Sequence, residues 1–135
     1  MLLTAFSHFI VVFLSAVFLL LPARPGEVVL TVTPEPDALR VEYVNRTNRA
    51  IETGGDRFLL EKEVAGQWEP VPFREGFSFP EIGHTVPPTR GGTFTIQPAR
   101  AFADPLSPGR YRLTFFYDCL TTEGGESAAT EFDLT

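Results

Sequence analysis

Few side chains in this sequence could act as nucleophiles, bases or metal ligands. The chain has one cysteine, Cys119, and two histidines, His8 in an apolar N-terminal stretch and His84 further on. A cysteine nucleophile needs an adjacent base, and a zinc site needs several spaced ligands. Neither pattern surrounds Cys119 or His84, so we expect no catalytic site, no metal site and no cofactor.

Cys119 alternates with apolar residues along a predicted strand, so we expect it to be a small buried hydrophobic residue. An unpaired cysteine cannot form an intramolecular disulfide, although an intermolecular one stays open. For His84 we expect a solvent-facing or hydrogen-bonded position on a loop.

Acidic side chains are numerous but lack a recognisable spacing. Glu61 and Glu63 alternate along one predicted strand, which indicates a solvated strand face. The other candidates have no calcium-loop spacing and lie at turns or strand ends: Glu35, Asp37, Asp56, Asp104 and Asp118. The glycine pairs also occur in turns, with no helix after them that could bind phosphate.

Asn45-Arg46-Thr47 has the form of a glycosylation acceptor. The surrounding residues are polar and lie between two predicted strands. We expect the Asn45 side chain to cap a turn there instead.

The charge distribution excludes one class of partner. The chain has 135 residues and a net charge of −6. Arg24 is the one charged residue before Glu27, so the rest of the chain has ten basic and seventeen acidic residues, a net charge of −7. An acidic chain without a basic cluster argues against nucleic acid as a partner.

Residues 1–23 are almost entirely apolar. A membrane-spanning helix needs about 20 such residues, and a signal-peptide core needs about 7–15. No Lys or Arg precedes the apolar run, and Leu21-Pro22-Ala23 is a poor cleavage site. We expect a hydrophobic helix that anchors the chain in the membrane through residues 2–22. A cleaved signal peptide and a buried core helix are the alternatives, the latter disfavoured by the Pro-rich linker that follows.

The remaining body, residues 27–135 after a linker at 24–26, predicts one all-β domain. Short alternating runs are separated by Gly, Pro, Asn and Asp, which is typical of an immunoglobulin-like antiparallel β-sandwich with seven or eight strands. Two prolines in the run 68–73 predict an edge strand, and residues 74–91 and 98–108 are expected to be irregular. The expected strands cover residues 27–33, 39–43, 57–64, 68–73, 93–97, 110–120 and 127–134.

A Pro-Gly turn precedes the strongest of these strands. In Pro108-Gly109-Arg110-Tyr111, the tyrosine stands at the strand entry. In sandwiches of this kind such a tyrosine turns back and its hydroxyl binds upstream backbone. We therefore predict a structural role for Pro108, Gly109 and Tyr111.

These features together resemble one type of bacterial immunoglobulin-like domain. The resemblance covers about residues 27–134 and is carried by the hairpin that ends at Trp68, the stretch 79–86, the Pro-Gly-Arg-Tyr-Arg corner and the last strand ending at Phe132. It implies an exported or surface-tethered protein, and therefore a body outside the cytoplasm, whereas Arg24 alone would favour a cytoplasmic body. The chain lacks the N-terminal lipoprotein cysteine that relatives often have, so lipid tethering is not implied.

Aromatic residues gather between residues 68 and 90. They either fill one end of the core or form a binding face, because exposed aromatic side chains on a rigid scaffold are typical contact residues. Phe116 faces away from the core row of its strand and adds a second apolar position. The candidate binding residues are Trp68, Phe73, Phe77, Phe79 and His84.

The sequence favours a non-catalytic, extracytoplasmic binding or interaction module of a bacterial envelope, with an unidentified protein or cell-envelope partner. The alternative is a protein inhibitor of a peptidase that acts through the loop at residues 74–90. An enzyme would require a pocket that joins His84 to two carboxylates.

Overall fold

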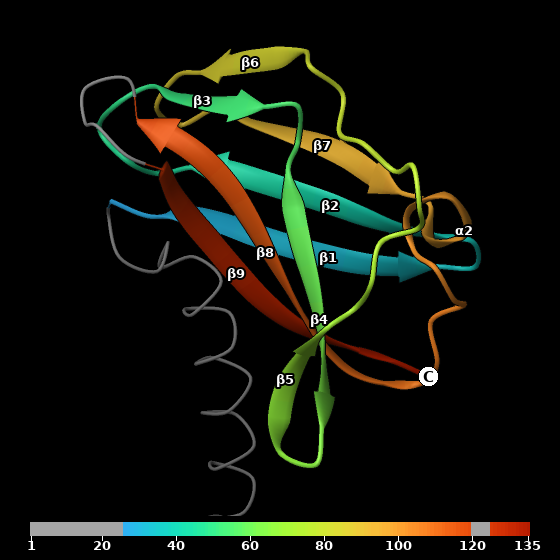
Figure 1. Cartoon of the computed structure of the whole chain (residues 1–135). Helices are drawn as coiled ribbons and strands as arrows, with labels where there is room; N and C mark the ends of the chain where they lie inside the picture. Colours follow the sequence, from blue (N-terminus) through green and yellow to red (C-terminus); the bar gives the residue numbers. More distant parts are fainter. Residues whose placement is uncertain (1–25, 120–124) are drawn as a thin grey trace, which may run out of the picture.

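The computed structural model describes residues 26–119 and 125–135 as a two-sheet β-sandwich (Figure 1). Within these residues the chain forms nine strands and one short helix. Their bounds are β1 Val28–Glu35, β2 Ala38–Asn45, β3 Ile51–Gly54, β4 Phe58–Val64, β5 Gln67–Pro70, β6 Gly83–Val86, β7 Gly91–Ile96, α2 Pro98–Ala101, β8 Gly109–Cys119 and β9 Gly125–Leu134. All seven expected strands are present, whereas β3, β6 and α2 were not predicted, so the prediction of seven or eight strands was too low.

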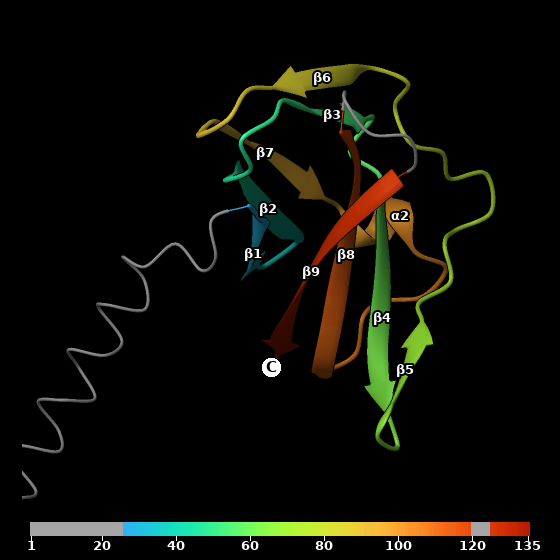
Figure 2. The ribbon, with the colours of Figure 1, turned by 90° about the vertical axis from the view of Figure 1, so that its left-hand side faces the viewer.

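The two sheets are unequal in size. One has three strands in the order β1-β2-β7, and the other has six, in the order β5-β4-β8-β3-β6 with β9 on the far edge of β8. Every pair is antiparallel, and β5 lies at an edge as its prolines predicted. Figure 2 shows the sheets as separate layers, with the β4–β5 hairpin projecting beyond them.

Strands β3 and β4 share one edge of β8. Ile51 pairs with Cys119, and Phe58 pairs with Phe115 further along. Between them the chain bends at Gly55, which has a φ of 70°. A Cβ at Gly55 would lie 1.6 Å from the carbonyl oxygen of Pro80, so this bend accepts only glycine.

Aromatic rings join the two sheets in the core. Tyr43 on β2 stacks on Phe115 on β8 with a centroid distance of 4.7 Å, and Phe58 on β4 stacks on Phe94 on β7 at 6.2 Å. Cys119 is buried, as the alternation predicted.

A buried amide fastens the sheets together at one end. Asn45, at the end of β2, is fully buried, and its Nδ2 donates to the carbonyl oxygens of Arg49 at 2.8 Å and Val86 at 3.0 Å. Its Oδ1 accepts from the backbone N–H and the hydroxyl of Thr47 at 3.0 and 2.6 Å. The expected turn cap is therefore present, and this amide is not accessible for glycosylation in the folded chain.

The predicted anchor over residues 1–23 lies outside the described residues. Within the described part of the chain, no helix has both the length and the apolar character needed to cross a membrane.

Replacing Asn45 tests this buried amide. Asn45→Ala removes two donated and two accepted hydrogen bonds and leaves the Val86 carbonyl oxygen without its donor. We expect urea unfolding to show a loss of about 2–4 kcal/mol in the free energy of unfolding. The matched control Asn48→Ala, at an exposed position in the same turn, should change it by less than about 0.5 kcal/mol. Equal losses in the two variants would contradict the role given to Asn45.

Candidate functional site

Three of the candidate binding residues pack into the core. Phe73, Phe77 and Phe79 are partly buried around Phe58, with centroid distances of 5.8, 6.3 and 5.2 Å to its ring. Phe73 also stacks on Phe77 at 5.1 Å. This packing supports the core interpretation of the aromatic cluster. A binding role for these three residues stays a prediction that their packing does not favour.

Trp68 lies apart from them, on the outer face of the six-stranded sheet. Its ring is covered by the Arg112 guanidinium, 4.7 Å from the ring centroid. Arg112 donates from Nε and Nη2 to one oxygen of Glu61 at 3.0 and 2.8 Å. The Glu61 side chain is only 14% exposed, so the expectation that it belongs to a solvated face was wrong. The contact between Trp68 and Arg112 therefore holds the β4–β5 hairpin against strand β8.

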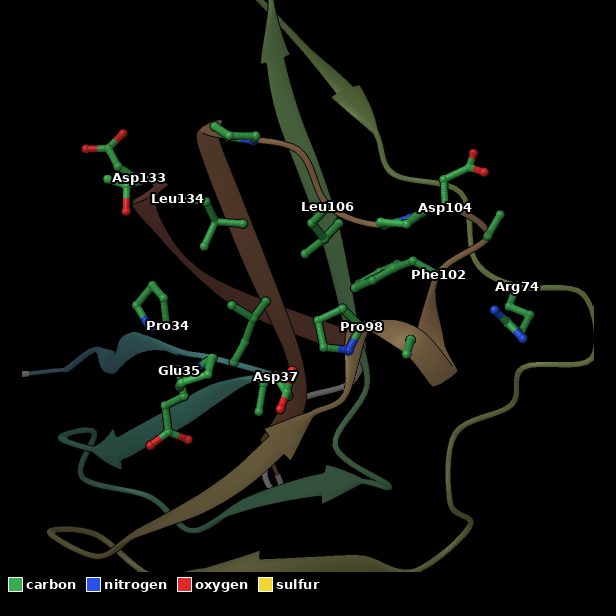
Figure 3. Close-up of a pocket in the computed structure, with 18 residues that line it drawn as sticks. Pro34, Glu35, Asp37, Arg74, Pro98, Phe102, Asp104, Leu106, Asp133 and Leu134 are labelled. Carbon is green, nitrogen blue, oxygen red and sulfur yellow. The ribbon is translucent and has the colours of Figure 1, made fainter.

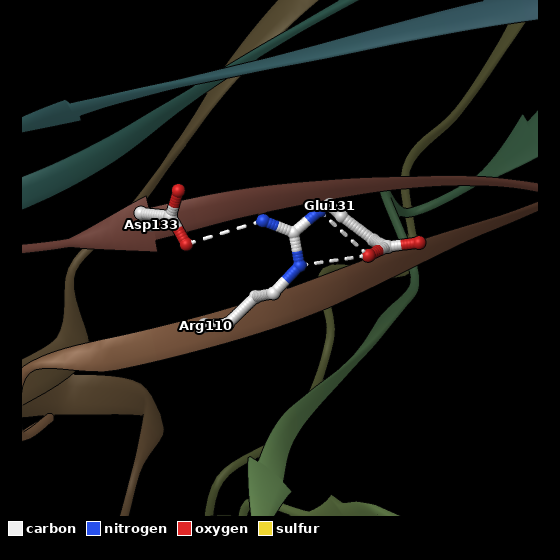
Figure 4. Close-up of polar contacts among 3 residues, drawn as sticks. All are labelled: Arg110, Glu131 and Asp133. Atoms are coloured by element: carbon white, nitrogen blue, oxygen red, sulfur yellow. Dashed lines mark hydrogen bonds and ion pairs between the residues drawn. The ribbon is translucent and has the colours of Figure 1, made fainter. Parts of the chain in front are cut away.

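A second arginine occupies the same outer face. Arg110 on β8 donates to Glu131 at 2.9 Å and to Asp133 at 3.3 Å, both on β9 (Figure 4). The hydrogen bond that Arg110 donates to Glu131, together with the negative charge of Glu131, raises the pKa of Arg110. Because these charges already pair across the strands, this face offers a ligand few free groups. Phe116, exposed as predicted, lies on it as well.

The enzyme alternative depends on the groups that surround His84. His84 is exposed, as expected, but it lies in strand β6 opposite Thr53 and not on a loop, so that part of the prediction was wrong. The carboxyl group of Asp56 is close enough to sense the charge of His84. Burial raises the pKa of Asp56, and the charge of His84 partly opposes this. Among residues 26–119 and 125–135, no three His, Cys, Asp or Glu side chains lie together in a way that could hold a metal ion.

A groove of about 820 Å³ lies at the end of the sandwich opposite Asn45. We call it the end groove. It is formed by the β1–β2 turn, α2, the loop after α2 and the end of β9, with Arg74 at one side (Figure 3).

The end groove has an apolar floor and rigid walls. Half-buried Leu106 and Leu134 line it above the buried side chains of Leu39 and Phe102. Proline has a fixed φ and no N–H group, so proline walls are preorganised and offer hydrogen-bond acceptors rather than donors. Five prolines line the groove: Pro34, Pro36, Pro98, Pro105 and Pro108.

The predicted tyrosine corner supports one wall of the groove. The Tyr111 hydroxyl donates to the carbonyl oxygen of Ser107 at 2.6 Å, which is the bond that the corner requires. Pro108 lines the groove, and Gly109 lies against Lys62, where a Cβ would come within 2.8 Å of Cε. The corner holds the loop that carries Leu106 and Pro108.

The rim of the end groove is acidic. Four carboxylates, Glu35, Asp37, Asp104 and Asp133, line it beside a single guanidinium, that of Arg74. Glu35 lies 3.9 Å from Arg40, and Asp133 pairs with Arg110. Asp37 and Asp104 make no ion pair with any residue of the described ranges.

Sequence reasoning identified Asp37 and Asp104 only as turn residues. Each is adjacent to a proline in a turn, in Pro36-Asp37 and Asp104-Pro105. Topology places both turns at one end of the sandwich, and this information was not available from spacing.

The sequence profile of a family described as a bacterial Ig-like domain matches residues 29–125. The chain belongs to this family. The match runs from β1 to the first residue of β9, so it covers the sandwich except for the rest of β9, whose end lines the groove. The resemblance found in the sequence is confirmed, and with it the Ig-like fold. A search of curated proteins gave no match.

The raised pKa of Asp56 predicts that the stability of this Ig-like domain depends on pH. Its pKa is raised in the folded state, so the folded chain binds its proton more tightly than the unfolded chain, where the ordinary value is 3.8. The carboxylate therefore lowers stability progressively as the pH rises from this value through the folded pKa. Asparagine keeps the left-handed backbone, with φ at 52°. We expect Asp56→Asn to be more stable than the wild type at about pH 7.5 and to lose this advantage at about pH 3.5. Thermal unfolding at both pH values measures it, and a pH-independent difference would contradict it.

Proposed function

We propose that this protein is a non-catalytic interaction module of the bacterial cell envelope, which is anchored by residues 2–22 and presents the end groove outside the cytoplasm. Membership in the bacterial Ig-like domain family and the apolar N-terminal segment support this proposal. A fold alone does not define a function, so the proposal depends on the groove.

The position of the end groove is the observation that carries the proposal. Strand β1 begins beside Gly26, whose N–H donates to the Arg46 carbonyl oxygen, and it ends at Glu35 in the groove. Eight strand residues span about 25 Å. Figure 1 shows the start and the end of β1 at opposite ends of the sandwich. An anchor that precedes Gly26 would therefore hold the groove at the far end of the domain, facing away from the membrane.

The chemistry of the groove favours a polypeptide segment in which Lys or Arg side chains alternate with apolar ones. Carboxylates and proline carbonyl groups accept hydrogen bonds from cationic donors, and Leu106 and Leu134 offer apolar contact. The volume is within the range of ligand sites, about 300–1,000 Å³. Rigid walls reduce the entropy cost of binding.

Peptide binding tests this proposal. The full chain in detergent micelles is titrated with a fluorescent peptide of alternating Lys and Leu, followed by fluorescence anisotropy. We expect saturable binding that weakens about 5- to 10-fold in Asp37→Asn/Asp104→Asn, because two carboxylate contacts are lost. It should also weaken at high salt.

The matched control is Glu63→Gln/Asp118→Asn, which removes the same charge at exposed positions outside the groove and should bind as the wild type does. Equal affinities of all three proteins, or equal binding of a Glu-Leu peptide, would refute the groove as the site.

The peptidase-inhibitor alternative has less support. Residues 74–90 are not one free loop, because Phe77 and Phe79 pack on the core and β6 occupies Gly83–Val86. Ile82, 70% exposed, is the feature that an inhibitor loop would present. Inhibition through this segment stays a prediction.

A further inference from the structure

Three exposed arginines surround the point at which the chain enters the sandwich. The Arg46 backbone exchanges hydrogen bonds with Gly26 and Glu27 at 3.0 and 2.9 Å. Arg49 lies three residues further along the same turn, and Arg90 follows β6 in the connection to β7. We call Arg46, Arg49 and Arg90 the arginine cluster.

Asn45 holds the backbone of this cluster in place. Its side chain donates to the Arg49 carbonyl oxygen at 2.8 Å, and its N–H donates to the Arg90 carbonyl oxygen at 2.8 Å. Its carbonyl oxygen accepts from the Thr89 N–H at 2.7 Å. Two separate turns, the one after β2 and the one between β6 and β7, are thus joined around one buried residue.

The arginine side chains are not neutralised within the described part of the chain. All three residues are exposed, and none makes an ion pair with any residue of the described ranges. Two acidic residues at the same end, Glu27 and Glu126, lie near Tyr117 on β8. Burial, with the charges of Glu126 and Glu27 among the smaller contributions, raises the pKa of Tyr117 to about 12.

We propose that the arginine cluster binds the anionic headgroups of the membrane in which residues 2–22 are anchored. This inference rests on the anchoring part of the proposed function. The four steps from Pro22 to Gly26 span at most about 14 Å, so the cluster would stay close to the surface, where basic residues are attracted to anionic lipids over roughly one Debye length.

Binding of the cluster would also orient the domain. The body has a net charge of −7, so an anionic surface repels most of it and attracts the arginine cluster. The acidic end groove lies at the opposite end of β1. The domain therefore stands with its groove away from the bilayer.

Energy transfer in reconstituted vesicles tests this contact. The full chain carries a donor dye at Asn48→Cys, between Arg46 and Arg49, with the buried Cys119 replaced by Ala, and the acceptor is a headgroup-labelled lipid. Vesicles contain phosphatidylcholine alone or with about one third phosphatidylglycerol. We expect at least about twofold higher transfer on the anionic vesicles, and this difference should disappear at high salt.

Charge variants identify the residues responsible. Arg46→Gln/Arg49→Gln/Arg90→Gln should abolish the difference between the two vesicle types, and the corresponding Lys variant should keep it. Arg40→Gln/Arg74→Gln/Arg100→Gln removes the same charge from other exposed positions and should keep it as well. Equal transfer on both vesicle types, or a difference that survives in the Arg46/Arg49/Arg90 Gln variant, would overturn the inference.

Sedimentation of the same vesicles separates this inference from the proposed anchor. A chain that sediments with both vesicle types but shows no charge-dependent transfer has the anchor and lacks the arginine contact. Sedimentation with anionic vesicles alone, lost in the Gln variant, supports the contact and refutes the anchor. A chain that sediments with neither type refutes both.

Discussion

One buried amide, that of Asn45, determines how the turns pack together at one end of this sandwich. A buried polar group is tolerated only when its hydrogen bonds are made, and Asn45 makes them with Thr47, Arg49 and Val86. Because β2 and β6 belong to different sheets, these bonds join the sheets as well as the turns. The start of β1, the turn after β2 and the arch between β6 and β7 are therefore placed together. Everything that we infer about this end depends on that placement.

The opposite end of the sandwich depends on a second hydrogen-bonded side chain, that of Tyr111, and on several proline residues. Tyr111 fastens the loop before β8 through Ser107, and the prolines keep that loop and the β1–β2 turn apart as walls of the end groove. The two ends of the domain thus differ in shape and in the charged groups that they expose. One has the arginine cluster, and the other has carboxylates around an apolar floor. Because β1 runs from one of these ends to the other, its direction says more about function than the fold class does.

Much of the fold could be predicted from the sequence because alternation reports burial on one face of a strand. Long strands such as β8 are clear for this reason. Strand β6 was not predicted because only Val86 of its four residues is buried, so it shows no alternation. Strand β3 was not predicted because Gly54 and Gly55 at its end are typical of a loop. The tyrosine corner was predictable because its turn and its tyrosine are adjacent in the chain.

The candidate site was less predictable because distant segments form it. Aromatic residues between 68 and 90 are close in sequence, but Phe77 packs on the core while Trp68 lies on the outer face of a sheet beside Arg112. The end groove combines a turn near Asp37 with a loop near Asp104, and spacing alone does not show that they meet. Asn45 was recognised as a turn cap, but its bond to Val86 spans forty-one positions and is visible only in three dimensions.

Labelling of single cysteines in intact cells tests the central claim, that the end groove faces outward and away from the membrane. The full chain carries Asp37→Cys at the groove or Asn48→Cys in the arginine cluster, each with Cys119 replaced by Ala, and is treated with a membrane-impermeant maleimide. The account predicts rapid labelling at position 37 in intact cells and slower labelling at position 48, with equal rates once the membrane is dissolved in detergent. Labelling of position 37 only after the cells are opened would place the body in the cytoplasm and contradict the account.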